Sequence, residues 1–262
     1  MASHEIVLYD IPSRPPCRAW SLNTWRVRLI LNYKNIPYRT EWLEYPDIKP
    51  KLSPHFPGQQ IETYTVPTIA LPDGREHIMN SRQIAKVLEA KYPSPPLLLD
   101  SPIAKRVTGL LIKIWDAIEV IILTHVHKRL LDEVNFPFWR ETREPWLNPD
   151  HATKDAAGDQ WKTLDTAEAE LYANGGALLD ECWANAGPAV DEIAQILRES
   201  PEGPFFCGEK VSFSDFQWIG FLLFIRRIGQ DQWDKMKASA KDFEPHEELL
   251  RAASDWIKRD DH

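Results

Sequence analysis

The sequence predicts two different domains in succession, a small α/β domain and then an all-helical domain. Three observations support this fold class. Runs typical of strands occur only before residue 93, helical periodicity dominates after residue 103, and the proline-rich segment Tyr92-Pro93-Ser94-Pro95-Pro96 lies between them. We therefore expect domains at 1–93 and 103–262, joined by a linker at 94–102.

The first element is a strand. Ile6–Tyr9 is continuously apolar between Glu5 and Asp10, which is typical of a strand buried on both faces. After a proline-rich loop, Trp25 and Tyr33 belong to an apolar set that recurs at helical spacing. A helix is therefore expected from about residue 24.

Three further strands and one helix complete the α/β domain. Tyr38–Glu44 alternates, Tyr64–Leu71 is interrupted by Pro67, and His77–Met79 is short. A less regular segment separates the first two. A helix is expected over 80–92, where Asn80 and Gln83 have the spacing of a capping pair. The order is thus β-α-β followed by β-β-α.

The second domain begins with a long helix. Ile103–Leu131 carries apolar residues around more than half of its circumference, so it must be covered on more than one side. Three later segments have the pattern of amphipathic helices: Lys154–Ala173, Ala189–Arg198 and Glu247–Arg259.

A strong helix start lies near residue 212. Ser212 can cap a helix while Asp215, three residues later, can act reciprocally. The helix that follows, Phe213–Ile228, is so apolar that we expect it at the centre of the domain. Asp132–Asp155 has no clear period. It is either an aromatic-anchored connection or a cover for a substrate.

Composition and charge exclude several classes of protein. Net charge is −8, which argues against nucleic acid as a partner. No apolar run approaches the roughly 18 residues of a membrane span, and the N-terminus lacks the pattern of a secretory signal. The three cysteines form no C-x-x-C and no paired framework, as expected of a cytoplasmic protein.

Charge is unevenly distributed along the chain. Residues 1–93 hold 12 basic and 9 acidic side chains, a balance of +3, whereas residues 94–262 hold 19 and 30, a balance of −11. An anionic ligand is therefore expected at the N-terminal domain.

Four local features, in this order, resemble the cytosolic glutathione transferases. They are a strand and loop leading into Ser21–Trp25, Val66-Pro67 at the start of an interior strand, Asn80-Ser81 opening a helix, and the capping box at Ser212–Asp215. The resemblance covers nearly the whole chain. It implies a thioredoxin-like domain that binds glutathione as cosubstrate, followed by the helical domain.

The opening is similar to the fungal FuA class of serine-type glutathione transferases, which are in turn similar to bacterial lignin β-etherases. The segments on which this similarity is based are Ile6–Asp10, Ser21-x-x-x-Trp25 and Tyr33–Tyr38. This resemblance implies a fungal source, a serine near the thiol, and a broad pocket for aromatic or polyphenolic compounds. The implied chemistry is conjugation, or glutathione-dependent cleavage of ethers and thioethers.

The resemblance also implies the residues that hold glutathione. Ser21, with Asn23 as a neighbouring donor, would stabilise the thiolate at the start of a helix, although both could simply be helix caps. A cis Val66-Pro67 bond would present the Val66 backbone to the ligand. The remaining contacts would come from Asn80 and Ser81 for the γ-glutamyl end, and from Lys51 and His55, or Lys49, for the glycine carboxylate.

Relatives of this family usually carry Asp or Glu at the position of Asn80. An amide brings no charge to the ligand's ammonium group, so weaker glutathione binding is expected here. The same resemblance implies a homodimer and a second-substrate site in the helical domain. Its candidate residues are Ile112, Trp115, Asp116 and Glu119.

Other functions remain open. A Cys17-dependent thiol transferase is one, and a protein of the same fold that binds polyphenols with little turnover is another. A non-catalytic glutathione-binding regulator is the third. His125 and His127, two residues apart on a helix, point apart, so no metal site is expected.

Overall fold

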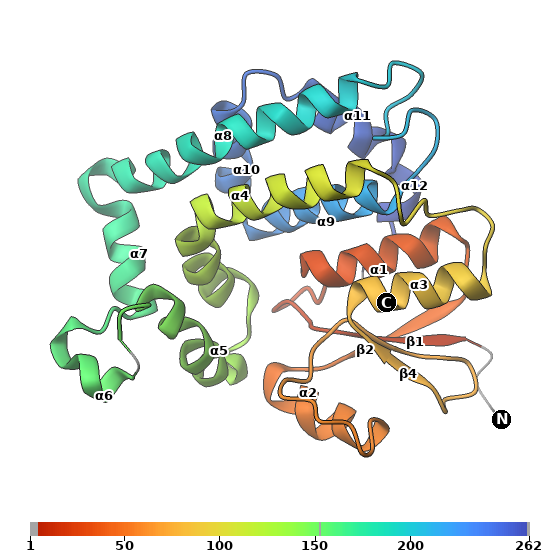
Figure 1. Cartoon of the computed structure of the whole chain (residues 1–262). Coiled ribbons are helices and arrows are strands. Elements are labelled where there is room, and N and C mark those ends of the chain that lie inside the picture. Colours follow the sequence, from red (N-terminus) through yellow and green to blue (C-terminus); the bar gives the residue numbers. More distant parts are fainter. Residues whose placement is uncertain (1–4, 152, 261–262) are drawn as a thin grey trace.

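A computed structural model describes residues 5–151 and 153–260. The predicted fold class is confirmed: a four-stranded sheet with its helices precedes an all-helical region (Figure 1). The strands are β1 (Ile6–Asp10), β2 (Tyr38–Trp42), β3 (Thr68–Ala70) and β4 (His77–Met79). Their order in the sheet is β2-β1-β3-β4. β1 is parallel to β2, and the other pairs are antiparallel.

The helices have the following bounds. They are α1 (Leu22–Tyr33), α2 (Tyr45–Leu52), α3 (Ser81–Lys91), α4 (Ile103–His125), α5 (Phe136–Arg143), α6 (Lys154–Ala157), α7 (Leu164–Tyr172), α8 (Ala177–Arg198), α9 (Phe213–Ile228), α10 (Gln230–Ser239), α11 (Glu244–Ala252) and α12 (Ser254–Ile257). A π-helical turn, Val126–Leu130, extends α4. Short 3₁₀ turns occupy Ser53–His55, Glu133–Asn135, Glu144–Leu147, Gly158–Gln160 and Ala173–Gly176.

Several predicted helices are wrong in extent. The 154–173 pattern breaks into α6 and α7 after Gly158, whose φ of 54° ends the helix. α8 begins at Ala177, twelve residues before the predicted start, and continues through Pro188. In place of the predicted helix Glu247–Arg259, the structure has two helices, α11 and α12. Asp132–Asp155, which has no period, nevertheless contains α5.

Besides α5, two helices were not predicted at all. α2 carries Pro46 in its first turn and Pro50 inside, which in sequence indicate a loop. α10 begins directly after α9, with Gly229 as the single residue between them. In the described part of the chain, no helix is long and apolar enough to cross a membrane.

α1 and α3 lie between the sheet and the helical region, whereas α2 lies on the opposite face of the sheet (Figure 1). One continuous core of buried side chains includes residues of β1, α1, α4, α8 and α9. The α9 backbone approaches α1 at Gly220, where an added Cβ would lie 2.9 Å from the carbonyl oxygen of Leu22. The two regions therefore position α1 together.

The capping box at the start of α9 is confirmed. The backbone N–H and hydroxyl of Ser212 both donate to Asp215, at 2.7 Å each. The other carboxylate oxygen of Asp215 accepts from the backbone N–H of Phe206 at 2.9 Å. Burial raises the pKa of Asp215 to about 6. These bonds fix the start of the central helix.

A buried ion pair joins α1 to the sheet. Arg28 lies 3.0 Å from the carboxylate of Asp10, and neither side chain is exposed. Arg28 also donates to Thr40 of β2 at 3.0 Å, and the backbone N–H of Ile11 donates to Asp10 at 2.7 Å. Burial raises the pKa of Asp10, and Arg28 opposes that shift.

We predict that Arg28→Met lowers the free energy of unfolding by about 3–5 kcal/mol, because it leaves the Asp10 carboxylate buried without its partner. Arg39→Met is the control, since Arg39 is half-exposed and lies 3.8–3.9 Å from Glu41 and Glu5. It should cost at most about 1 kcal/mol. Urea denaturation measures both, and equal small losses would contradict the prediction.

We also predict that acid destabilises the fold through His246. The indole N–H of Trp218 donates to Nδ1 of His246 at 3.0 Å, so this nitrogen must be unprotonated, and burial lowers the pKa of His246 to about 4. Below pH 6.5 the unfolded chain binds the proton first. The free energy of unfolding should therefore fall as pH drops from 6.5 to 4, by about 3 kcal/mol for this residue.

The control for this prediction is His246→Gln, which keeps an acceptor for Trp218 but does not titrate. Asp215 contributes in the opposite direction, since its raised pKa favours the folded state as pH falls below 6. Asp215 is present in both proteins, so the difference between their pH profiles reports His246. Parallel profiles between pH 6.5 and 4 would show that the imidazole has no such role.

Candidate functional site

The topology of the sheet brings three predicted segments to one edge. β1 ends at Asp10, and the loop after it leads to Ser21. Because β1 and β3 are antiparallel, with Tyr9 opposite Thr68, the end of β1 lies beside the start of β3. Val66 and Pro67 immediately precede β3, so they share this edge.

Ser21 is the N-cap residue of α1. Its backbone is extended, its side chain is half-buried, and its hydroxyl makes no capping hydrogen bond. Asn23, in the first turn, is exposed. The first N–H groups of a helix lack intrahelical partners and favour negative charge nearby. A hydroxyl that does not cap the helix is available to a ligand there, so the arrangement suits an anion.

The predicted cis peptide bond between Val66 and Pro67 is present. Val66 is half-buried, and within the described residues its backbone N–H and C=O take part in no hydrogen bond. The carbonyl of Pro67 accepts from the backbone N–H of Asn80 at 3.3 Å. This bond joins the start of β3 to the start of α3 and places two of the predicted segments side by side.

Asn80 caps α3, as its spacing predicts. Its Oδ1 accepts from the backbone N–H groups of Arg82 at 3.0 Å and Gln83 at 3.4 Å. The capping is not reciprocal, because the Asn80 N–H is bonded to Pro67 instead. Asn80 is exposed, with a φ of 79° that asparagine tolerates better than most residues. Ser81 is buried beside it.

Lys51 and His55 lie in another cluster. The ammonium group of Lys51 is bonded to the carboxylate of Glu41 and lies 5.8 Å from the ring centre of Tyr9. His55 stacks on His77, with ring centres 3.8 Å apart. All five residues line a cavity of about 330 Å³ that also includes the turn between β3 and β4.

That turn is at the end of β3 remote from the cis peptide bond. The residues lining the cavity do not include Ser21, Val66 or Asn80. The geometry therefore does not bring Lys51 and His55 together with the other predicted site residues. Their assignment to the glycine carboxylate stays a prediction.

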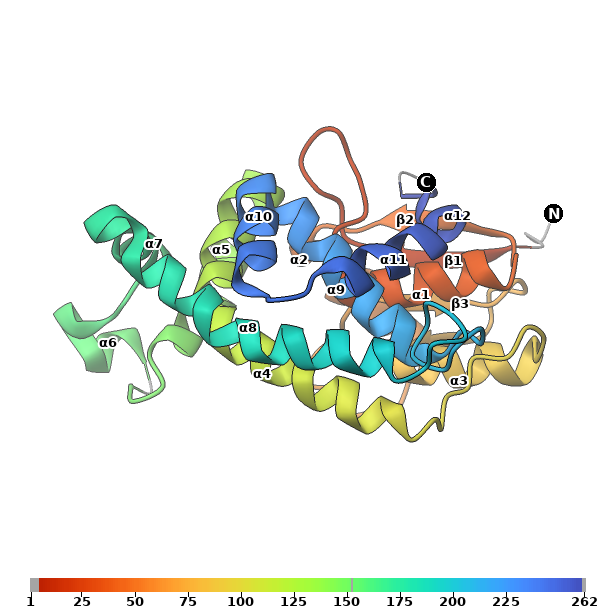
Figure 2. The same cartoon turned by 90° about the horizontal axis from the view of Figure 1, so that it is seen from above.

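Cys17 lies exposed in the loop between β1 and α1, which projects from the body of the molecule in Figure 2. Desolvation and the nearby carboxylates of Asp10 and Glu44 raise the pKa of its thiol. A raised pKa disfavours the thiolate, which is the reactive form. The electrostatics of this loop therefore do not suit a cysteine nucleophile.

The C-terminal segment holds the same loop. The Asp260 carboxylate pairs with Arg18 of the loop at 2.8 Å and with Arg227 of α9 at 2.7 Å. Its backbone carbonyl accepts from the N–H of Ala19, also at 2.7 Å. Ala19 is two residues before Ser21. The sequence gives no local signal for this contact, because its partners are 242 residues apart.

The predicted second-substrate residues share one face of α4. Ile112 is 55% exposed and Asp116 is also exposed. Trp115 and Glu119 are half-buried, and the indole N–H donates to the carboxylate at 3.3 Å. A large apolar side chain that is open to solvent can take a ligand or a partner.

The segment Asp132–Asp155 is anchored to the α/β domain. Asn135 donates to Glu44 at 2.6 Å and accepts from the backbone N–H of Tyr45 at 2.8 Å. Tyr45 stacks on Phe138, with ring centres 5.0 Å apart, and its pKa is raised to about 12 by burial. The indole N–H of Trp139 donates to the carbonyl of Leu123. These contacts are those of an aromatic-anchored connection.

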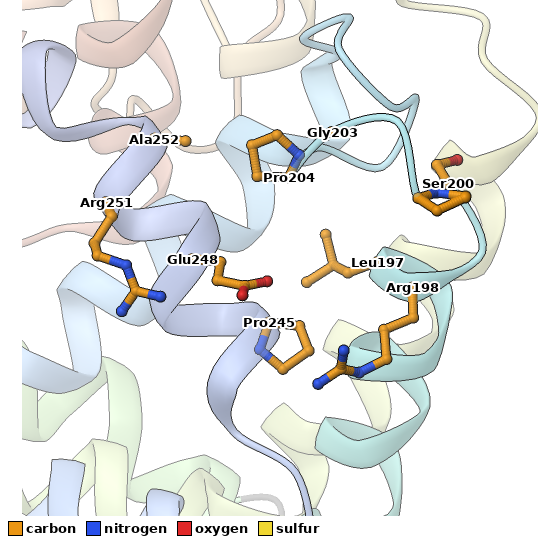
Figure 3. A pocket seen from close by; sticks show the side chains of 10 residues that line it. Leu197, Arg198, Ser200, Gly203, Pro204, Pro245, Glu248, Arg251 and Ala252 are labelled. Carbon is orange, nitrogen blue, oxygen red and sulfur yellow. The ribbon is translucent and has the colours of Figure 1, made fainter.

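A larger cavity, of about 610 Å³, lies between the end of α8, the loop after it and α11 (Figure 3). The Glu248 carboxylate points into it. Arg198 and Arg251 also line it, but they pair with Asp242 and Glu244. None of the predicted site residues belongs to this cavity.

Both regions of the chain match one family. The family description "Glutathione S-transferase, N-terminal domain" matches residues 20–91, and "Glutathione S-transferase, C-terminal domain" matches residues 166–256. Together they cover more than half of the chain. A similar curated protein is the glutathione S-transferase-like protein ustS of Aspergillus flavus, 27% identical over 86% of this chain and 82% of that protein.

Two of the solved structures with a similar fold come from fungi. CsGST63524 of Ceriporiopsis subvermispora, solved in complex with glutathione, has a TM-score of 0.74 and 25% identity, covering 97% of this chain and 98% of its own. GSTFuA2 of Phanerochaete chrysosporium has a TM-score of 0.75 and 23% identity, covering 98% and 99%. The latter likeness shows the fold alone.

Proposed function

The chain belongs to the glutathione S-transferase family, and from that premise we propose that it transfers glutathione to aromatic electrophiles through a thiolate stabilised at Ser21. The observation that carries this proposal is the half-buried Ser21 hydroxyl, which does not cap α1 although it lies at its N-terminus. The family assignment identifies the enzyme as a glutathione transferase. The serine mechanism and the aromatic substrates are our inference.

The proposed role of Ser21 is to hold the sulfur in its charged form. A free thiol titrates near ~8.5, so at neutral pH most glutathione is unreactive. A hydrogen bond to a charged acceptor is worth roughly 1.5–3 kcal/mol, equivalent to about one to two pKa units. The N-terminus of α1 adds to the effect, and Asn23 is a second donor within the first turn.

The rest of glutathione would lie along the start of β3 and α3. The Val66 backbone would pair with the cysteinyl unit, and the first N–H groups of α3 with Ser81 would hold the γ-glutamyl carboxylate. Asn80 would face the ammonium group through a neutral amide. A similar protein from Ceriporiopsis subvermispora was solved in complex with glutathione, which supports glutathione as the ligand.

The second substrate would enter from the helical domain, beside Trp115. We propose aromatic or polyphenolic compounds, which the sequence resemblance to the FuA class implies. We also propose a homodimer, in which the second subunit covers the face of α4 that carries the exposed Ile112. With all three cysteines free, we also propose a cytoplasmic location.

We predict that Ser21→Ala lowers the rate of conjugation at least about tenfold, because it removes the hydroxyl donor from the sulfur. Cys17→Ser, the control, should change the rate little, since the raised pKa of this thiol disfavours its thiolate. Steady-state kinetics with glutathione and 1-chloro-2,4-dinitrobenzene measures both.

The reverse pattern would indicate a cysteine-type thiol transferase. A partial loss that Asn23→Ala completes would show that the two donors share the sulfur. Tight binding of a polyphenol with negligible turnover in the unaltered protein would favour a binding function over transfer.

We also predict that Asp260→Ala lowers kcat/KM about three- to tenfold and raises the pKa of the bound thiol, because it releases the loop that leads to Ser21. Removal of a nearby negative charge alone would lower that pKa, so the sign separates positioning from electrostatics. Asp255→Ala is the control, since Asp255 is an exposed residue whose one ion pair within residues 5–151 and 153–260 is with Lys258. An unchanged pH–rate profile in Asp260→Ala would refute the positioning role.

A further inference from the structure

Arg26 of α1 has no partner of its own in the described part of the chain. It takes part in no ion pair or hydrogen bond within residues 5–151 and 153–260, and its Nε is enclosed without an acceptor. Burial lowers the pKa of its guanidinium to about 10, so the group stays charged at neutral pH. A charge that is partly removed from water is costly unless an anion compensates it. The missing anion points to a ligand.

Arg26 lies on the open strip of α1 next to the proposed sulfur site. Over the ten residues 22–31 only Leu22, Asn23 and Arg26 are not buried. Helical side chains lean towards the N-terminus, so we expect the Arg26 side chain to run back over the turn that holds Leu22 and Asn23, towards Ser21. Its two terminal nitrogens have no partner either, yet they are not enclosed as Nε is. The end of the fork is therefore reachable from solvent.

The backbone of this part of α1 lies beside the helical domain. An added Cβ on Gly220 of α9 would lie 2.9 Å from the carbonyl of Leu22 and 3.7 Å from the backbone nitrogen of Arg26. The segments proposed for glutathione, Val66-Pro67 and Asn80-Ser81, belong instead to the α/β domain. Arg26 is thus placed between the sulfur and the side from which the second substrate would come.

We propose that Arg26 binds a carboxylate of the second substrate, so that the enzyme favours aromatic electrophiles that carry an acid group. The inference rests on the proposed function. The planar guanidinium offers parallel N–H donors that match the two oxygens of a carboxylate. In the reaction the thiolate sulfur forms a bond to the ring carbon, the carbon–chlorine bond breaks, and chloride leaves with the electron pair. Arg26 transfers no proton and only holds the acid group.

Two electrophiles that differ by one carboxylate test the proposal. These are 1-chloro-2,4-dinitrobenzene, which is neutral, and 4-chloro-3,5-dinitrobenzoate. Arg26→Gln should lower kcat/KM for the benzoate about tenfold or more, and change that for the neutral compound less than about threefold. Arg26→Lys, which keeps the charge but not the fork, should lie between.

The control variant is Lys86→Gln. It removes one positive charge from the exposed surface of α3, where Lys86 has no ion pair among the described residues. Both of its rates should match those of the unaltered protein. A general attraction of the positive N-terminal domain for acids would instead lower the benzoate rate in this variant too, and would overturn the proposal.

The ratio of the two rates keeps the test valid if a variant folds poorly, because a loss of folded protein lowers both equally. Suppose that Arg26→Gln and Arg26→Lys are folded, as judged by circular dichroism, and that each loses kcat/KM for both electrophiles equally. Arg26 would then serve glutathione, and the proposal would fail. No conjugation of the neutral compound by the unaltered protein would instead refute the proposed function. The two failures are therefore distinguishable.

Discussion

The ion pair between Asp10 and Arg28 fixes the geometry on which the site depends. Both side chains are fully buried, at the point where β1 ends and the loop to Ser21 begins. Arg28 is on α1, and it also bonds Thr40 of β2, so three elements meet at one guanidinium. Because such a pair is costly to bury, it adds little to the net free energy of unfolding. Removal of either partner nevertheless lowers that free energy strongly, since the other charge stays buried alone. The pair sets where the N-terminus of α1 lies relative to the sheet.

The opposite side of α1 is held by the helical domain. Gly220 lets the α9 backbone approach the first turn of α1, and Tyr33 near its end packs on Phe216 and Trp256. The sheet thus orients α1 from one side, and α9 with the C-terminal segment orients it from the other. A thiolate site at this N-terminus would be built by both domains, even though the residues proposed to touch glutathione come from only one.

Features set by local chemistry were predictable from the sequence. The Ser212–Asp215 box and the capping by Asn80 depend on residues two or three apart, and both are present. α2 was not predicted, because Pro46 and Pro50 are tolerated in a helix that packs against the sheet. Contacts between distant residues have no signature in the sequence. Examples are the ion pair of Asp260 with Arg18 and that of Lys51 with Glu41. That Arg26 finds no partner among the described residues is likewise visible only in three dimensions, because a sequence does not show which acidic side chains are absent from the surroundings of a residue.

The attachment of Asp260 to the loop before Ser21 has a consequence for the order of biosynthesis. The ribosome makes residues 11–21 long before residue 260, and the strand and helix that flank them can form while the chain is still growing. Their last restraint is encoded some 240 residues later. A nascent chain that has completed the whole α/β domain therefore still lacks the contact that holds the loop before Ser21, and the proposed site acquires its final form only when translation has passed residue 260.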